Sequence, residues 1–170
     1  MLDYAYFHQV KLKQTWAKVA MDPRFKFIAP GSYTNLDFDL KFNSFSRLQL
    51  VSLSDKGEII GYIDAAVDRE AYYAYGLWTI NMPEQPNDTF TNDIAEFLRR
   101  LFLTWNFQKL KFSVVVGDPS EIMYDELVPK YNGKVIGVHQ RDIRLPDGKL
   151  YDMKLYEFLR ENYMNANGIN

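Results

Sequence analysis

The chain contains no cysteine. Disulfide bonds, thiolate metal sites and cysteine nucleophiles are therefore excluded together, while the compartment stays open because a cysteine-free protein tolerates any redox environment. An excess of one charge is also missing, since the sequence has 20 Lys and Arg residues and 22 Asp and Glu residues. A domain with this balance lacks the basic surface that attracts nucleic acid or an anionic membrane, so neither partner is predicted.

Long apolar runs are absent as well. No stretch of the sequence approaches the roughly 20 apolar residues of a membrane-spanning helix. Residues 1–14 carry polar side chains every few positions and so lack the apolar core of a signal peptide. These features predict a cytoplasmic protein that does not enter a membrane.

The sequence does contain enough apolar material for one core. Hydrophobic residues make up 47% of the 170 residues, and aromatic residues make up 16%. For this length, such a composition favours a single domain whose core is built largely from aromatic rings. We predict one domain over residues 1–164, followed by a frayed tail at residues 165–170.

In the first half of the chain, apolar and polar residues alternate over residues 4–10, which predicts a strand. Helical spacing over residues 11–20 and a turn at residues 29–32 follow, then a short helix at residues 36–42. Gly61 falls within a predicted strand, where it indicates a bulge or a close approach. Three successive antiparallel strands, the first two joined by a hairpin turn at 55–57, are predicted at residues 48–53, 59–63 and 72–80.

The second half is patterned more clearly. We predict Thr91 or Asn92 as the N-cap of a strongly amphipathic helix, and Ser120 as the cap of the next helix. The elements are a helix to residue 105, a buried strand at 110–116, a helix at 120–129 and a hairpin of residues 135–144 and 149–158. Their order predicts an α+β fold, a mixed but mainly antiparallel sheet flanked by helices in an α/β/α sandwich.

Several motifs in this half resemble those of a known family. Ser120 and Tyr124 fit the N-x-x-S-x-x-x-Y helix of the GNAT acyl-CoA N-acyltransferases, with Gly117 where Asn is usual. Residues 137–160 are similar to the ending of the ribosomal-protein-type N-acetyltransferases, and the resemblance extends over most of the chain from Ser46. It implies transfer of an acetyl group from acetyl-CoA to a primary amine.

The resemblance also implies a place for the cofactor, between the splayed fourth and fifth strands. The backbone of Ile80, Asn81 and Met82 would line the pantetheine arm. The family's pyrophosphate loop, Q/R-x-x-G-x-G/A, aligns from Gln85, but its glycines fall on Asp88 and Phe90. A helix beginning near Thr91 still offers amides and a dipole to phosphate. The remaining cofactor-binding candidates are Gln85, Asn87, Thr89, Thr91, Asn92 and Ser120.

Acyl transfer from a thioester needs a group that stabilises or protonates the departing thiolate. Tyr124 is the candidate for this catalytic role, which is also the role of the matching family tyrosine; the alternative is a core aromatic. No general base stands out, and Asp68 and Glu70 are the nearest carboxylates to the fourth strand. We interpret His8 and His139 as half-buried strand residues, and neither has a partner at metal-ligand spacing.

The sequence also allows two other functions. The first is a catalytically silent GNAT-fold module that has lost its CoA site and recruits a partner, which Asp88 and Phe90 favour. The second is an unrelated α+β scaffold. A homodimer is also possible on edge-strand grounds, through the strand at residues 149–158.

Overall fold

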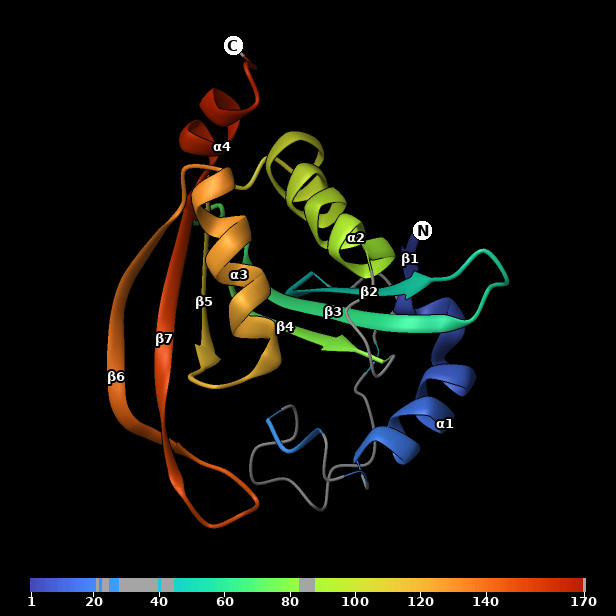
Figure 1. The fold of residues 1–170 in the computed structure, drawn as a ribbon. Coiled ribbons are helices and arrows are strands. Elements are labelled where there is room, and N and C mark those ends of the chain that lie inside the picture. The colour runs from blue at the N-terminus through green and yellow to red at the C-terminus, as the bar shows by residue number, and fades with distance from the viewer. Residues whose placement is uncertain (21, 23–24, 28–39, 41–44, 83–87, 170) are drawn as a thin grey trace.

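The computed structural model describes residues 1–20, 22, 25–27, 40, 45–82 and 88–169. Figure 1 shows one sheet with helices on both faces. The strands are β1 (Leu2–Tyr4), β2 (Arg47–Leu53), β3 (Ile59–Asp68), β4 (Tyr73–Asn81), β5 (Lys109–Val115), β6 (Lys134–Arg144) and β7 (Leu150–Leu159). The helices are η1 (Ala5–His8, 3-10), α1 (Gln9–Ala20), α2 (Asp88–Arg99), η3 (Arg100–Thr104, π-helical), α3 (Pro119–Lys130) and α4 (Arg160–Ala166).

The strands form one seven-stranded sheet in the order β1-β2-β3-β4-β5-β7-β6. Every neighbouring pair is antiparallel except β4 and β5, which are parallel. The predicted fold class, a mixed and mainly antiparallel sheet flanked by helices, is therefore confirmed. Among the described residues, no helix combines the length and the apolar character needed to cross a membrane.

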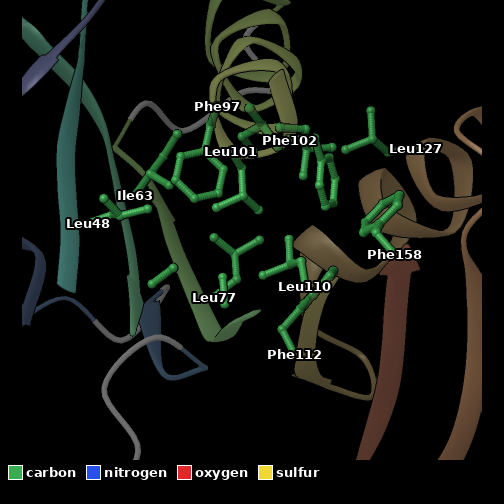
Figure 2. Close-up of a cluster of buried hydrophobic side chains, with 14 of the residues drawn as sticks. Leu48, Ile63, Leu77, Phe97, Leu101, Phe102, Leu110, Phe112, Leu127 and Phe158 are labelled. Carbon is green, nitrogen blue, oxygen red and sulfur yellow. The ribbon is translucent and has the colours of Figure 1, made fainter. Parts of the chain in front are cut away.

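Two hydrophobic clusters lie on opposite faces of the sheet. The smaller one packs α1 against β2, β3 and β4 through Leu12, Trp16, Tyr62 and Ile80. The larger one lies under α2 and α3 and continues from one half of the sheet to the other. Figure 2 shows it as a continuous set of side chains reaching from Leu48, Ile63 and Leu77, past the α2–η3 helix, to Leu110, Phe112, Leu127 and Phe158.

The prediction for the amino terminus was wrong in part. Residues 4–10 were expected to form a strand, but β1 ends at Tyr4 and the chain turns at once into η1 and α1. Ala5, Leu12 and Trp16 are all buried against the sheet, so a helical face extends back into the alternating segment. His8 consequently lies in a 3-10 helix, where its ring pairs with Asp3 at 2.8 Å.

Other boundaries also need correction. Helix α2 begins at Asp88, so Thr91 and Asn92 lie inside it and neither is the N-cap. The N-cap of α3 is Asp118, whose carboxylate accepts from the Ser120 N–H at 2.7 Å, so Ser120 is not the cap. Strand β7 lies between β5 and β6, so the predicted edge strand is internal, and the two edges of the sheet are β1 and β6.

The remaining predicted elements lie close to their expected positions. The strands at 48–53, 59–63 and 72–80 are β2, β3 and β4, and the hairpin at 135–144 and 149–158 is β6–β7. Helix α4 continues to Ala166, within the segment predicted to be a frayed tail. The turn at residues 29–32 and nearly all of the short helix predicted at 36–42 lie outside the described residues.

Candidate active site

Strands β4 and β5 start side by side and then separate. Their pairing consists of three residue pairs, which join Tyr73–Tyr75 to Lys109–Lys111. In Figure 1 the two strands point in clearly different directions beyond this contact. The predicted splaying of the fourth and fifth strands is therefore a feature of the described backbone.

A bulge in β4 begins this divergence. Between Asp64 and Ala66, β3 advances by two residues while β4 advances by three, from Trp78 to Tyr75. The bulged segment between Tyr75 and Trp78 contains Gly76, whose φ of +60° is unfavourable for most residues with a side chain. A bulge bends its strand and increases the local twist, which turns the end of β4 away from β5.

Beyond Tyr75, the main-chain polar groups that β4 directs to the β5 side pair with no strand among the described residues. The Met82 N–H donates to the Ile60 carbonyl at 2.9 Å, so Met82 directs its polar groups toward β3. Because this direction alternates along an antiparallel strand, Thr79 and Asn81 direct theirs to the β5 side. Three residues were predicted to line a pantetheine arm with their backbone. The main-chain groups of Asn81 point to the open side, as this role needs, whereas those of Ile80 and Met82 point to β3. Thr79 is a position that the sequence analysis missed.

The side chain of Asn81 supplies a further polar group. Its Oδ1 atom is buried and has no hydrogen-bond partner within the described part of the chain. Asn81 lies directly opposite Gly61 in the ladder, and Gly61 lies against Phe90 of α2. The unsatisfied oxygen therefore lies on the α2 face of the sheet, where a ligand donor would remove the cost of its burial.

Phe90 and Asp88 stand where a glycine-rich phosphate loop has its glycines, and only Asp88 places its side chain at the start of α2. Phe90 is buried, and a Cβ on Gly61 would lie 2.1 Å from its ring, so this side chain packs on the sheet rather than at the helix end. The predicted close approach at Gly61 is thus confirmed. Asp88, in contrast, is exposed in the first turn and places a carboxylate there.

The other predicted cofactor-binding residues do not all lie at the start of α2. The helix starts three residues before Thr91, so the amides of its first turn belong to Asp88, Thr89 and Phe90. Asn92 is exposed one turn further along the helix. Gln85 and Asn87 lie outside the described residues. Ser120 lies at the start of a different helix, α3, where its amide is occupied by Asp118.

Tyr124 projects from α3 toward the open part of β4. Its side chain is only 2% exposed, and its hydroxyl lies 2.9 Å from the Thr79 hydroxyl. The ring packs against Phe112 with centroids 4.7 Å apart and against Tyr156 at 6.0 Å. Burial raises the pKa of the Tyr124 phenol well above its ordinary value, so the hydroxyl keeps its proton at neutral pH.

The candidate carboxylates for a general base do not gather around Tyr124. Asp68 pairs with Tyr73 at the far end of β4, about 20 Å along the strand from Thr79 at 3.3 Å per residue. Its side chain caps a turn by accepting from the Glu70 and Ala71 amides. His139 lies on the edge strand β6, exposed and 3.7 Å from Asp142. None of these groups supports the assignment of a base.

One buried carboxylate lies closer to β4, on the opposite face of the sheet. Asp64, opposite Trp78, is 3% exposed and accepts from Arg47 Nε at 3.0 Å and from Arg47 Nη2 at 2.5 Å. The Tyr62 hydroxyl also donates to it at 3.3 Å. Burial raises the pKa of Asp64 although Arg47 opposes the shift. With its oxygens engaged in this way, Asp64 fits a structural ion pair.

Among known proteins, only solved structures match this chain. No protein-family model and no curated protein matches the sequence. Solved structures do match: the spermidine/spermine N-acetyltransferase SpeG from Vibrio cholerae, in complex with manganese ions, has 20% sequence identity and a TM-score of 0.63. That match covers 72% of this chain and 71% of the other.

Two further structures agree with it. A chimera of the Vibrio cholerae enzyme with hSSAT has 20% identity and a TM-score of 0.62, covering 72% of this chain and 75% of that one. A structure titled a probable acetyltransferase has 15% identity and a TM-score of 0.59, covering 69% and 64%. At these identities the likeness shows the fold, which is the one that the sequence resemblance implied.

Proposed function

We propose that this chain, which has the fold of the GNAT N-acetyltransferases, transfers an acetyl group from acetyl-CoA to a primary amine. The observation that supports the proposal best is the divergence of β4 and β5 with the buried Tyr124 hydroxyl beside it. The fold shared with the solved acetyltransferases argues against an unrelated α+β scaffold.

The residues at the divergence fit a pantetheine chain, which carries amide donors and acceptors. Thr79 and Asn81 present main-chain N–H and C=O groups that an extended ligand can bond as an added strand would. The buried Asn81 Oδ1 accepts a hydrogen bond from an amide N–H of such a ligand. Acetyl-CoA, when bound there, supplies an activated acetyl thioester.

Tyr124 provides the polar group for the leaving sulfur. A neutral phenol donates a hydrogen bond to a sulfur that gains negative charge, and in a buried site this stabilises the transition state more than it would in water. Tyr124 is buried and protonated, as this role requires. The amine loses its proton to water, because Asp118, the carboxylate whose charge acts on Tyr124, is the N-cap of α3 and accepts from the Ser120 N–H.

The start of α2 fits the pyrophosphate of acetyl-CoA less well than β4 fits the pantetheine chain. The carboxylate of Asp88 at the start of α2 repels a pyrophosphate, while the helix dipole attracts it. This single residue favours the second candidate function, a catalytically silent GNAT-fold module that binds a partner. Thr89, Thr91, Asn92 and Ser120 remain candidates for cofactor contacts, as do Gln85 and Asn87.

Calorimetric titration with acetyl-CoA and with CoA separates the two functions. Micromolar binding supports the acetyltransferase, and Asp88→Asn should tighten it because a repulsive charge is removed. A panel of primary amines, with spermidine among them because SpeG is a spermidine N-acetyltransferase, then tests turnover. Tyr124→Phe should bind acetyl-CoA normally and lose about 100-fold in kcat. If neither acetyl-CoA nor CoA binds at millimolar concentration, the acetyltransferase is contradicted and the catalytically silent module is supported.

The cytoplasmic location, the single domain over residues 1–164 and the homodimer remain proposals. The edge strand beside β7 is β6, and it carries irregularities between Val135 and Gly137 and between His139 and Ile143. Bulges of this kind oppose edge-to-edge pairing. Light scattering after size exclusion tests the dimer, and we expect a dimer, if one forms, not to extend the sheet through β6.

A further inference from the structure

We infer that Thr79 is a positioning residue, whose hydroxyl donates to the Tyr124 oxygen and thereby leaves the phenolic hydrogen directed at the leaving sulfur. The inference rests on the proposed acetyl transfer and adds a residue to it. The sequence gives no sign of this role, because Thr79 stands in an aromatic-rich strand without any motif.

The geometry brings the two hydroxyls together from distant parts of the chain. Thr79 lies on β4 just past the bulge, and Tyr124 lies on the second turn of α3, 45 residues later. Their oxygens are 2.9 Å apart, and either can be the donor. The Tyr124 ring is held by Phe112 and Tyr156, so the phenol oxygen has a fixed place beside β4.

The direction of this hydrogen bond decides what Tyr124 can do. A hydroxyl has one donor hydrogen and two acceptor lone pairs. If Tyr124 donates to Thr79, its hydrogen is used and cannot reach a ligand. If Thr79 donates instead, the phenolic hydrogen is available to a second acceptor. Thr79 is β-branched, so its χ1 is restricted and its hydroxyl stays near the phenol.

The surroundings of Tyr124 favour donation without proton transfer. Asp118, the N-cap of α3, adds its negative charge to burial in raising the pKa of Tyr124. An ordinary thiol has a pKa near 8.5, so a phenol with a pKa above 10 does not give its proton to a thiolate. Tyr124 therefore keeps its hydrogen throughout. In the net reaction the amine nitrogen loses one proton to water and the thiolate gains one from water.

The first test needs no ligand. Protein labelled with carbon-13 at tyrosine Cζ reports hydrogen bonding at each phenol, and Tyr124→Phe identifies the signal of Tyr124. Thr79→Val, which keeps the shape but lacks the hydroxyl, should move that signal, and Thr79→Ser should return it toward the original position. Thr15→Val in α1 is the control and should leave it unchanged. A Tyr124 signal that is identical in Thr79→Val overturns the inference.

The second test measures coupling in the reaction. Thr79→Val should lower kcat about tenfold, the effect of one hydrogen bond, while the Kd for acetyl-CoA stays within about twofold. In the Tyr124→Phe background the same change should have almost no effect, and Thr79→Ser should restore most of the activity. Equal losses in both backgrounds overturn the positioning role while leaving the acetyltransferase intact. An unmodified protein that neither binds acetyl-CoA nor transfers acetyl groups overturns both proposals.

Discussion

The two halves of the sheet are buried differently. Strands β2 and β3 lie between α1 on one face and α2 on the other, and nearly every residue of both strands is buried or half-buried. Strands β7 and β6 continue the sheet beyond β5 and pack α3 on one face, and β6 is exposed along most of its length. Figure 1 shows β6 and β7 as two long curved strands on the side of the molecule opposite α1.

The difference in burial changes how a cationic partner affects the pKa of a carboxyl group in each half. In the covered half, Asp64 pairs with Arg47, and burial still raises the Asp64 pKa. In the open half, Asp125 pairs with Lys154 at 2.7 Å, and the hydrogen bond from Lys154 lowers the Asp125 pKa. Desolvation outweighs the partner in the first case, whereas the partner outweighs desolvation in the second.

The largest expected effect is the loss of the buried pair. Arg47→Met should lower the free energy of unfolding by about 3 kcal/mol at neutral pH, because the Asp64 charge is left buried without its cation. Urea denaturation measures it. A loss under about 1 kcal/mol would mean that water reaches Asp64 and that the halves do not differ in this respect.

The same variant has a predictable pH dependence. Without Arg47 the folded-state pKa of Asp64 rises further above its ordinary value, because Arg47 lowers it now. A carboxyl whose pKa is raised on folding favours the folded state when protonated, and that stability is lost as pH rises from the unfolded pKa through the folded pKa. The deficit of Arg47→Met should therefore shrink on acidification. A deficit independent of pH would contradict the assignment to Asp64.

A second comparison uses glycines on strands of the two halves. Gly61→Ala in β3 should cost about 2 kcal/mol, because the new methyl group would overlap the Phe90 ring. The matched control is Gly137→Ala in β6, which meets no atom within 4 Å and should be neutral or slightly stabilising. Thermal and urea unfolding of both variants give the answer. Similar stabilities would show that α2 shifts freely on the sheet.

The boundary between the halves is the bulge at Gly76. Gly76→Ala should cost about 1 kcal/mol, because its φ of +60° is unfavourable for alanine. It should also weaken acetyl-CoA binding, since the bulge directs Thr79 and Asn81. Gly57→Ala in the β2–β3 turn, at a φ of +72°, carries the same backbone cost and should bind normally. Equal Kd values for the two variants would separate the bulge from the ligand site.

The smallest effect is expected in the open half. Lys154→Met should lower the free energy of unfolding by about 0.5 kcal/mol, and less at high salt, because water reaches its shorter pair, with Asp125, whose side chain is 42% exposed. Tyr156 also donates to Asp125 at 2.9 Å, and the substitution does not remove this hydrogen bond. A loss as large as that of Arg47→Met would remove the contrast between the halves.

Prediction from the sequence succeeded where a local pattern and the tertiary environment agreed. The β6–β7 hairpin has a Pro-Asp-Gly turn, and α2 has one strongly apolar face, so both lay near their expected positions. Residues 4–10 alternate like a strand, but the burial of Ala5 beside Leu12 and Trp16 makes most of them helical. Alternation over a few residues is too weak to override such packing.

For the candidate site, the sequence pointed to Tyr124 by resemblance and to Asn81 as one of three neighbouring strand residues. It did not reveal Thr79, because the bond to Tyr124 joins residues 45 positions apart. Nor could it separate Asn81 from Ile80 and Met82, whose main-chain direction depends on the register with β3. That register is set by the bulge at Gly76, which no local motif announces.

By itself, the sequence determined the number and kind of most elements, the aromatic core and the order that gives this fold, because these follow from apolar periodicity and turn residues along the chain. The tertiary structure decided which strand lies at the edge, where β4 leaves β5 and which side chains meet Tyr124. These depend on contacts between distant segments, whose energies no local window of sequence contains.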